Sequence, residues 1–127
     1  MKTSATIAIA AAFLAAPLSA GPSAEVNAEK FYVTALELKG KGALAMFDSR
    51  TKPMMAQMKD AGLTARNANA AATKRGAPLY CVPEAARKRG LDNEKALAML
   101  GAVGKSARQE LTLDKAWLRA LQKEYPC

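Results

Sequence analysis

The amino-acid sequence predicts an all-α protein: a compact array of four to five helices, with one disulfide from a central extended segment to the C-terminus. Apolar residues recur at i, i+4 and i+7 in several segments, which is the spacing of one helix face. Glycines and prolines separate these segments. No stretch alternates between apolar and polar residues in the way that a half-buried strand would.

The first 20 residues, "MKTSATIAIAAAFLAAPLSA", have the pattern of a secretory signal. Lys2 supplies a positive start, and the apolar run that follows is shorter than the roughly 20 residues that span a bilayer. Small residues follow Pro17, and we place the cleavage after Ala20. A membrane anchor is the alternative interpretation. The sequence therefore predicts a periplasmic protein whose mature chain, residues 21–127, forms a single helical domain.

The first expected helix lies in the segment 23–40, "SAEVNAEKFYVTALELKG". Its apolar face is formed by Phe31, Ala35 and Leu38. Ser23 and Asn27 are both candidate caps for its start, and Gly40 is suited to its end. These features indicate an amphipathic helix that contributes one face to the core.

The connector that follows, "GKGALAMFDS", contains a short helical turn in which Leu44 and Phe47 are three residues apart. We expect these two side chains to tuck under the first helix.

A second helix is expected in the segment 49–76, with Pro53 in its first turn. Methionines and alanines line one side of it at helical spacing. We interpret this stripe as core packing that lets helices approach closely, and an adaptable methionine-rich binding groove is the alternative. The stripe consists of Met54, Met58, Ala61, Ala65, Ala68 and Ala72.

The segment "APLYCVPE" contains two prolines, which cannot donate backbone hydrogen bonds, so we expect an extended crossing segment. A short turn, "PEAARKRG", follows it. Asp92 is then expected to cap a helix that ends early near Gly101 and Gly104. The last helix begins at Thr112 or Leu113, and its apolar line includes Trp117 and Leu121.

Cys81 and Cys127 are the two cysteines of the chain. In an oxidising compartment such a pair usually forms a disulfide. The bridge would close a loop of about 47 residues, and the chain-entropy relation for such a loop gives about 4 kcal/mol. An intermolecular bridge is an alternative, and so is a catalytic thiol. A thiol nucleophile normally needs a base such as histidine, and the sequence contains none.

Little in the sequence points to catalysis. The acidic residues are scattered, histidine is absent, and "GKGALA" lacks the Lys-Ser/Thr signature of a phosphate loop. We therefore predict no enzyme activity, no metal and no cofactor.

Basic residues exceed acidic ones in the mature chain. Without Lys2 it holds 18 basic and 11 acidic side chains, a net charge of +7. Nucleic acid is a poor candidate partner outside the cytoplasm. A basic face could instead meet anionic lipid, cell-wall polymer or an acidic protein, or it could simply be a solvated helix end.

Two cysteine motifs, "PLYCVPE" and the terminal "YPC", resemble the C-terminal signature of the Rap/Tai immunity family. The resemblance covers roughly residues 76–127. It implies a small exported helical protein of bacteria that binds a toxin in the periplasm. The toxins concerned are cell-wall amidases delivered by type VI secretion systems. The matching residues are Leu79, Tyr80, Cys81, Pro83, Glu84, Tyr125, Pro126 and Cys127.

The segment from Val82 to Asp92 is the predicted partner-binding region. The bridge at Cys81 would hold one end of it, and proline limits its freedom, which lowers the entropy lost on binding. The face bearing Met54 and Met58 is the alternative contact surface. A second copy of the chain, forming a homodimer, is an alternative partner. The predicted contact residues are Pro83, Glu84, Arg87, Lys88, Arg89 and Asp92.

Overall fold

The computed structural model describes residues 21–127, so the predicted signal peptide lies outside the described residues. The described chain is helical with no strand, and its helices share one buried apolar cluster, as the sequence predicts. The 3-10 helices (η) and α-helices follow in the order η1 (Pro22–Ala24), α1 (Ala28–Gly40), η2 (Gly42–Phe47), α2 (Thr51–Lys74), α3 (Glu84–Arg89), α4 (Asn93–Ala102), α5 (Lys105–Glu110) and α6 (Leu113–Glu124).

Helix α1 begins at a side-chain cap. The Asn27 side chain accepts hydrogen bonds from the backbone N–H groups of Glu29 (3.0 Å) and Lys30 (3.1 Å), which would otherwise lack partners. Asn27 is therefore the cap, and the other candidate, Ser23, bonds elsewhere. The buried face of α1 includes Phe31 and Leu38, as predicted.

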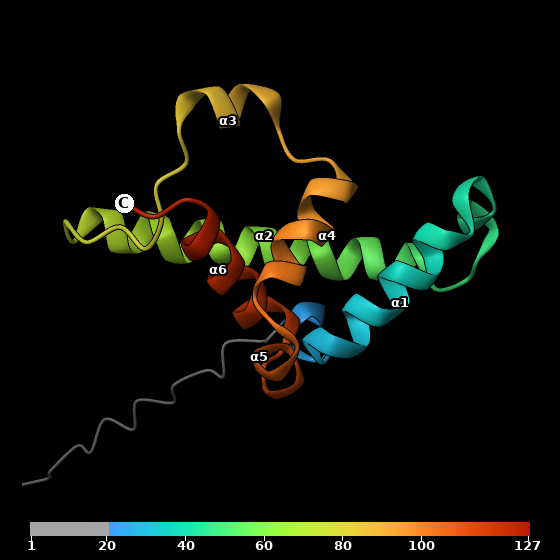
Figure 1. The fold of residues 1–127 in the computed structure, drawn as a ribbon. Coiled ribbons are helices and arrows are strands. Elements are labelled where there is room, and N and C mark those ends of the chain that lie inside the picture. Colours follow the sequence, from blue (N-terminus) through green and yellow to red (C-terminus); the bar gives the residue numbers. More distant parts are fainter. Residues whose placement is uncertain (1–20) are drawn as a thin grey trace, which may run out of the picture.

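Helix α2 runs the length of the molecule, and α6 packs across it (Figure 1). Its alanines Ala61, Ala65 and Ala72 are buried. Such small side chains let α6 approach closely and bring its own buried residues, Leu113 and Trp117 among them, into the core. The core interpretation of the stripe is thus right for these alanines, whereas Met54 and Met58 are only half-buried.

The extended segment between α2 and α3 is held at two points. The Asn69 side-chain oxygen accepts hydrogen bonds from the backbone N–H of Leu79 (2.8 Å) and of Tyr80 (3.2 Å). The Cys81 N–H donates to the Tyr125 carbonyl at 2.8 Å, and Cys81 forms the predicted disulfide with Cys127. The C-terminus is thereby fixed to the centre of the chain.

Helix α5 was not expected from the sequence. Helix α4 ends at Ala102, close to where the glycines predict its end, but Gly104 then caps a further helical turn and a half rather than a loop. Arg108 on α5 is 6% exposed. Its guanidinium donates to Glu29 Oε2 at 2.6 Å and to the Gly101 carbonyl at 2.8 Å, which explains how this charged residue is accommodated in the interior.

Candidate functional site

The predicted contact region stands apart from the helical body. Helix α3 is joined to α2 and α4 by extended connections and lies to one side of both (Figure 1). None of its residues is buried. Arg87, Lys88 and Arg89 are all exposed on its last turn. The structure therefore brings the predicted cationic residues together on one short, accessible helix.

The other predicted contact residues have mixed placements. Pro83 is the N-cap residue of α3, and Glu84 pairs with Lys88 at 3.4 Å. Both side chains of that pair are more than three-quarters exposed, so the pair contributes little to stability. Asp92 accepts a hydrogen bond from the Lys95 N–H at 2.7 Å and caps α4. Asp92 thus has a structural role that is sufficient to explain its presence.

A larger feature lies on another part of the molecule. Helices α1, α2 and α4, together with η2, enclose an open groove of about 570 Å³. A volume of this size is typical of ligand and side-chain pockets. Its lining is mainly apolar and includes Leu38, Met54, Met55, Met58, Leu97 and Leu100.

Several apolar side chains at this groove are exposed to solvent. Met55, in the groove wall, is 65% exposed. In the adjoining turn η2, whose Gly42 and Ala45 line the groove, Leu44 is 69%, Met46 81% and Phe47 87% exposed. We call these four side chains, with the groove, the apolar face. Exposed apolar side chains that form one contiguous patch mark surfaces that other molecules cover.

The prediction that Leu44 and Phe47 tuck under the first helix is wrong. The chain instead turns Ala45 toward the groove. The Ala45 carbonyl accepts hydrogen bonds from the Thr51 hydroxyl (2.6 Å) and the Asp48 N–H (3.1 Å), and this fixes the orientation of η2. Because Ala45 faces the groove, its neighbours Leu44 and Met46 are exposed to solvent.

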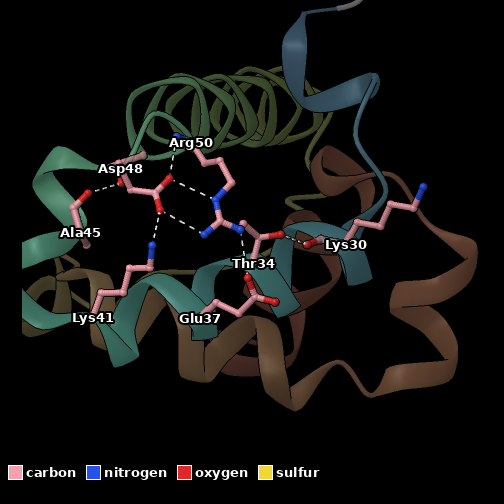
Figure 2. Close-up of polar contacts among 8 residues, drawn as sticks. Lys30, Thr34, Glu37, Lys41, Ala45, Asp48 and Arg50 are labelled. Atoms are coloured by element: carbon pink, nitrogen blue, oxygen red, sulfur yellow. Dashed lines mark hydrogen bonds and ion pairs between the residues drawn. The ribbon is translucent and has the colours of Figure 1, made fainter.

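An ion-pair cluster holds η2 in place (Figure 2). Asp48 accepts hydrogen bonds from Lys41 Nζ at 2.7 Å and from Arg50 Nε at 3.0 Å, and Arg50 Nη1 donates to Glu37 at 2.9 Å. The hydrogen bonds from Arg50 and then Lys41 hold the pKa of Asp48 well below its ordinary value. The cluster connects the end of α1 to the start of α2 across the turn. The η2 part of the apolar face is therefore held by interactions from both helices.

Sequence reasoning missed most of the apolar face. It named Met54 and Met58 as an alternative contact surface, and both line the groove. It did not name Met46 or Met55. The signal that could have identified Met46 is the run "GALAMF", because six residues in a short turn between two helices cannot all be buried. Met55 lies outside this run, on α2.

Metal and membrane features are not found in the described part of the chain. No group of three or more His, Cys, Asp or Glu side chains among residues 21–127 is placed to hold a metal ion. Over the same residues, none of the helices combines the length and hydropathy of a membrane span.

Comparison with protein-family models, curated proteins and solved structures gives no match. The resemblance to the Rap/Tai immunity family therefore rests on the two cysteine motifs and stays a prediction.

Proposed function

We propose that this is an exported, non-catalytic binding protein that occludes the working surface of another protein. By its resemblance to Rap/Tai immunity proteins, the partner would be a toxin, such as a peptidoglycan amidase effector. The observation that carries the proposal is the apolar face, on which four large side chains are 65–87% exposed beside a groove of about 570 Å³.

The shape and lining of the groove favour an amphipathic helix of the partner as occupant. Grooves between helices accept the apolar side chains that such a helix presents at i, i+3 and i+4. Methionines suit this role because their unbranched side chains adapt to irregular surfaces. Met54, Met55 and Met58 supply three of them along the groove.

The charges at the groove favour an acidic flank on that helix. Lys39 and Lys59 lie in the groove lining. Lys39 pairs with Glu94 at 3.4 Å, but both side chains are more than half exposed, so the pair is easily exchanged for another. The mature chain carries a net charge of +7. An acidic partner would therefore associate faster than a basic one.

The ion-pair cluster that holds η2 in place favours tight binding. The hydrogen bonds of Asp48 fix the turn before any partner arrives. A surface that is already ordered loses less conformational entropy on association. Steric occlusion needs nothing more, since a bound protein excludes substrate by its bulk.

The proposal is tested with immobilised mature protein in periplasmic extract, followed by titration of the purified partner. The wild type should retain one protein stoichiometrically. Met46→Ser together with Phe47→Ser should weaken its affinity at least tenfold, about 1.4 kcal/mol. Leu63→Ser is the matched control, because Leu63 is 47% exposed on α2 outside the groove lining. Equal affinity of all three proteins would reject the apolar face as the binding surface.

A second function is favoured by the position of η2. The η2 turn lies at one end of the molecule, between the end of α1 and the start of α2 (Figure 1). Its side chains Leu44, Met46 and Phe47 are exposed, and Lys41, Arg50 and Lys52 are close to them in the chain. Apolar tips flanked by cations bind anionic bilayer surfaces. An envelope-associated role on anionic lipid or cell-wall polymer is the alternative. Salt-sensitive co-sedimentation with phosphatidylglycerol vesicles, lost in Phe47→Ser, would favour it over a protein partner.

A further inference from the structure

The start of the described chain is bound by an acidic side chain of α2. The backbone N–H of Ser23 donates to Asp60 Oδ2 at 3.0 Å, and the Ser23 hydroxyl donates to the same oxygen. Ser23 is 1% exposed, and η1 packs against both α2 and α6. Asp60 therefore anchors the first residues of the domain to the core.

Gly21 lies directly against this carboxylate. A Cβ atom built on Gly21 would be 2.5 Å from both Cγ and Oδ2 of Asp60, and closer still to Oδ1. These separations are below any real contact of a Cβ, so only glycine fits while Asp60 keeps its place. Within residues 21–127, both hydrogen bonds to the Asp60 side chain end on Oδ2, which leaves Oδ1 facing the backbone of Gly21.

The backbone nitrogen of Gly21 is close enough to Asp60 for a charge to matter. The N and Cβ atoms on one Cα are about 2.5 Å apart by standard bond lengths and angles, so this nitrogen lies within about 5 Å of the carboxylate. An opposite charge within about 4–6 Å stabilises an ionised group. In the unprocessed chain, however, this nitrogen is a neutral amide.

We propose that cleavage of the Ala20–Gly21 bond completes the fold, because the new α-ammonium group of Gly21 pairs with Asp60. Hydrolysis by a signal peptidase breaks the C–N bond, transfers the hydroxyl of water to the Ala20 carbonyl carbon and leaves the proton on the nitrogen. That amine, protonated near neutral pH, sits beside the carboxylate. The inference rests on the export that the proposed function requires. It assigns Gly21 as the first residue of the mature chain and Asp60 as its binding site.

The consequence is a mature protein more stable than any form in which residue 21 is acylated. Part of the stabilisation is gained only after the leader is removed. A precursor that is less stable stays unfolded more readily, which suits passage through a translocation channel.

The test compares two forms of residues 21–127: one with a free Gly21 amine and one acetylated at that amine. Each form is made with Asp60 and with Asp60→Asn. Acetylation should lower the equilibrium constant for folding about twofold to fivefold in the wild type, the range of a partly exposed ion pair. It should have little effect in Asp60→Asn. The same loss in both backgrounds would overturn the proposal, because the amine would then act without Asp60.

Two further measurements keep the proposal falsifiable if Asp60→Asn fails to fold. Gly21→Ala keeps the amine but pushes the carboxylate away, so acetylation should lose its effect there too, whereas Lys59→Gln should leave that effect intact. Mass spectrometry of the exported protein should find Gly21 at its N-terminus. A different first residue would overturn this inference and leave partner binding, measured separately, unaffected.

Discussion

Arg108 and Glu29 form an ion pair of 2.6 Å across 79 positions of sequence, with side chains only 7% and 15% exposed. The pair joins α5 to the first turn of α1. The Arg108 guanidinium also lies 4.0 Å from the centre of the Tyr32 ring and donates to the Leu100 and Gly101 carbonyls. The Nε and Nη1 atoms of this buried cation thus both have hydrogen-bond partners, and α1, α4 and α5 are held together through it.

Removing one member of this pair should be strongly destabilising. Arg108→Met leaves the Glu29 carboxylate and two backbone carbonyls without their hydrogen-bond donor. We expect a loss of about 3–5 kcal/mol in the free energy of unfolding. Changing both residues to Met should cost less than Arg108→Met alone, because no charge is left unpaired. Chemical denaturation measures both effects. Lys88→Ala, which breaks an exposed pair, is the control and should change stability by less than about 1 kcal/mol.

The disulfide should account for a large part of the stability. Reduction, or Cys81→Ser, is expected to cost about 2–5 kcal/mol. Helical content should fall as well, because the chain after α6 is tied back at Cys127. Thermal unfolding followed by circular dichroism checks both points, and an unchanged midpoint after reduction would show that the bridge is dispensable. Thiol titration of the unfolded, unreduced protein should find no reactive group, and two groups per chain would contradict an intramolecular bridge.

The Asp48 cluster predicts part of the acid sensitivity of the fold. The pKa of Asp48 is lowered in the folded state, chiefly by its hydrogen bonds to Arg50 and Lys41, relative to about 3.9 for an unperturbed aspartate. Its contribution to stability is therefore complete above about pH 5, and it declines as the pH falls through 3.9 toward the folded-state value. Asp48→Asn should make the fall of the melting temperature between pH 5 and pH 2 shallower. Ser49→Ala, a neutral change at the next residue, should keep the wild-type slope.

The long helices and the bridge could be predicted because their signals are local or nearly unique. The alanine line of α2 and the Leu113–Trp117–Leu121 line of α6 repeat over several turns, so a single helix face accounts for each. The bridge followed from the prediction of export together with the two cysteines, which leave one pairing within the molecule.

The features that prediction missed depend on contacts that the spacing of apolar residues does not encode. The sequence "KSARQE" has the composition of a polar surface turn. Arg108 is nevertheless buried, because it forms an ion pair with Glu29 and packs on the ring of Tyr32, both on α1. In η2, the three-residue spacing of Leu44 and Phe47 fits a helix face equally well inward or outward. In the structure the Thr51 hydroxyl and the Asp48 N–H donate to the Ala45 carbonyl while Leu44 and Phe47 are exposed, an arrangement that the apolar spacing does not reveal.

The last prediction separates the two candidate contact surfaces. Arg87, Lys88 and Arg89 are exposed on α3, and none of that helix is buried, so changing all three to Ser should leave the melting temperature close to that of the wild type. If α3 provides electrostatic attraction alone, the triple variant should bind an acidic partner with a slower association rate, and the loss should shrink as salt is raised. Dissociation should change little. The Met46→Ser, Phe47→Ser variant should instead dissociate faster and associate at nearly the wild-type rate, because loss of buried apolar contact acts mainly on dissociation. Surface plasmon resonance at two salt concentrations measures both rates. A tenfold faster dissociation of the triple variant, at either salt concentration, would instead place α3 inside the interface and contradict the assignment of the apolar face as its centre.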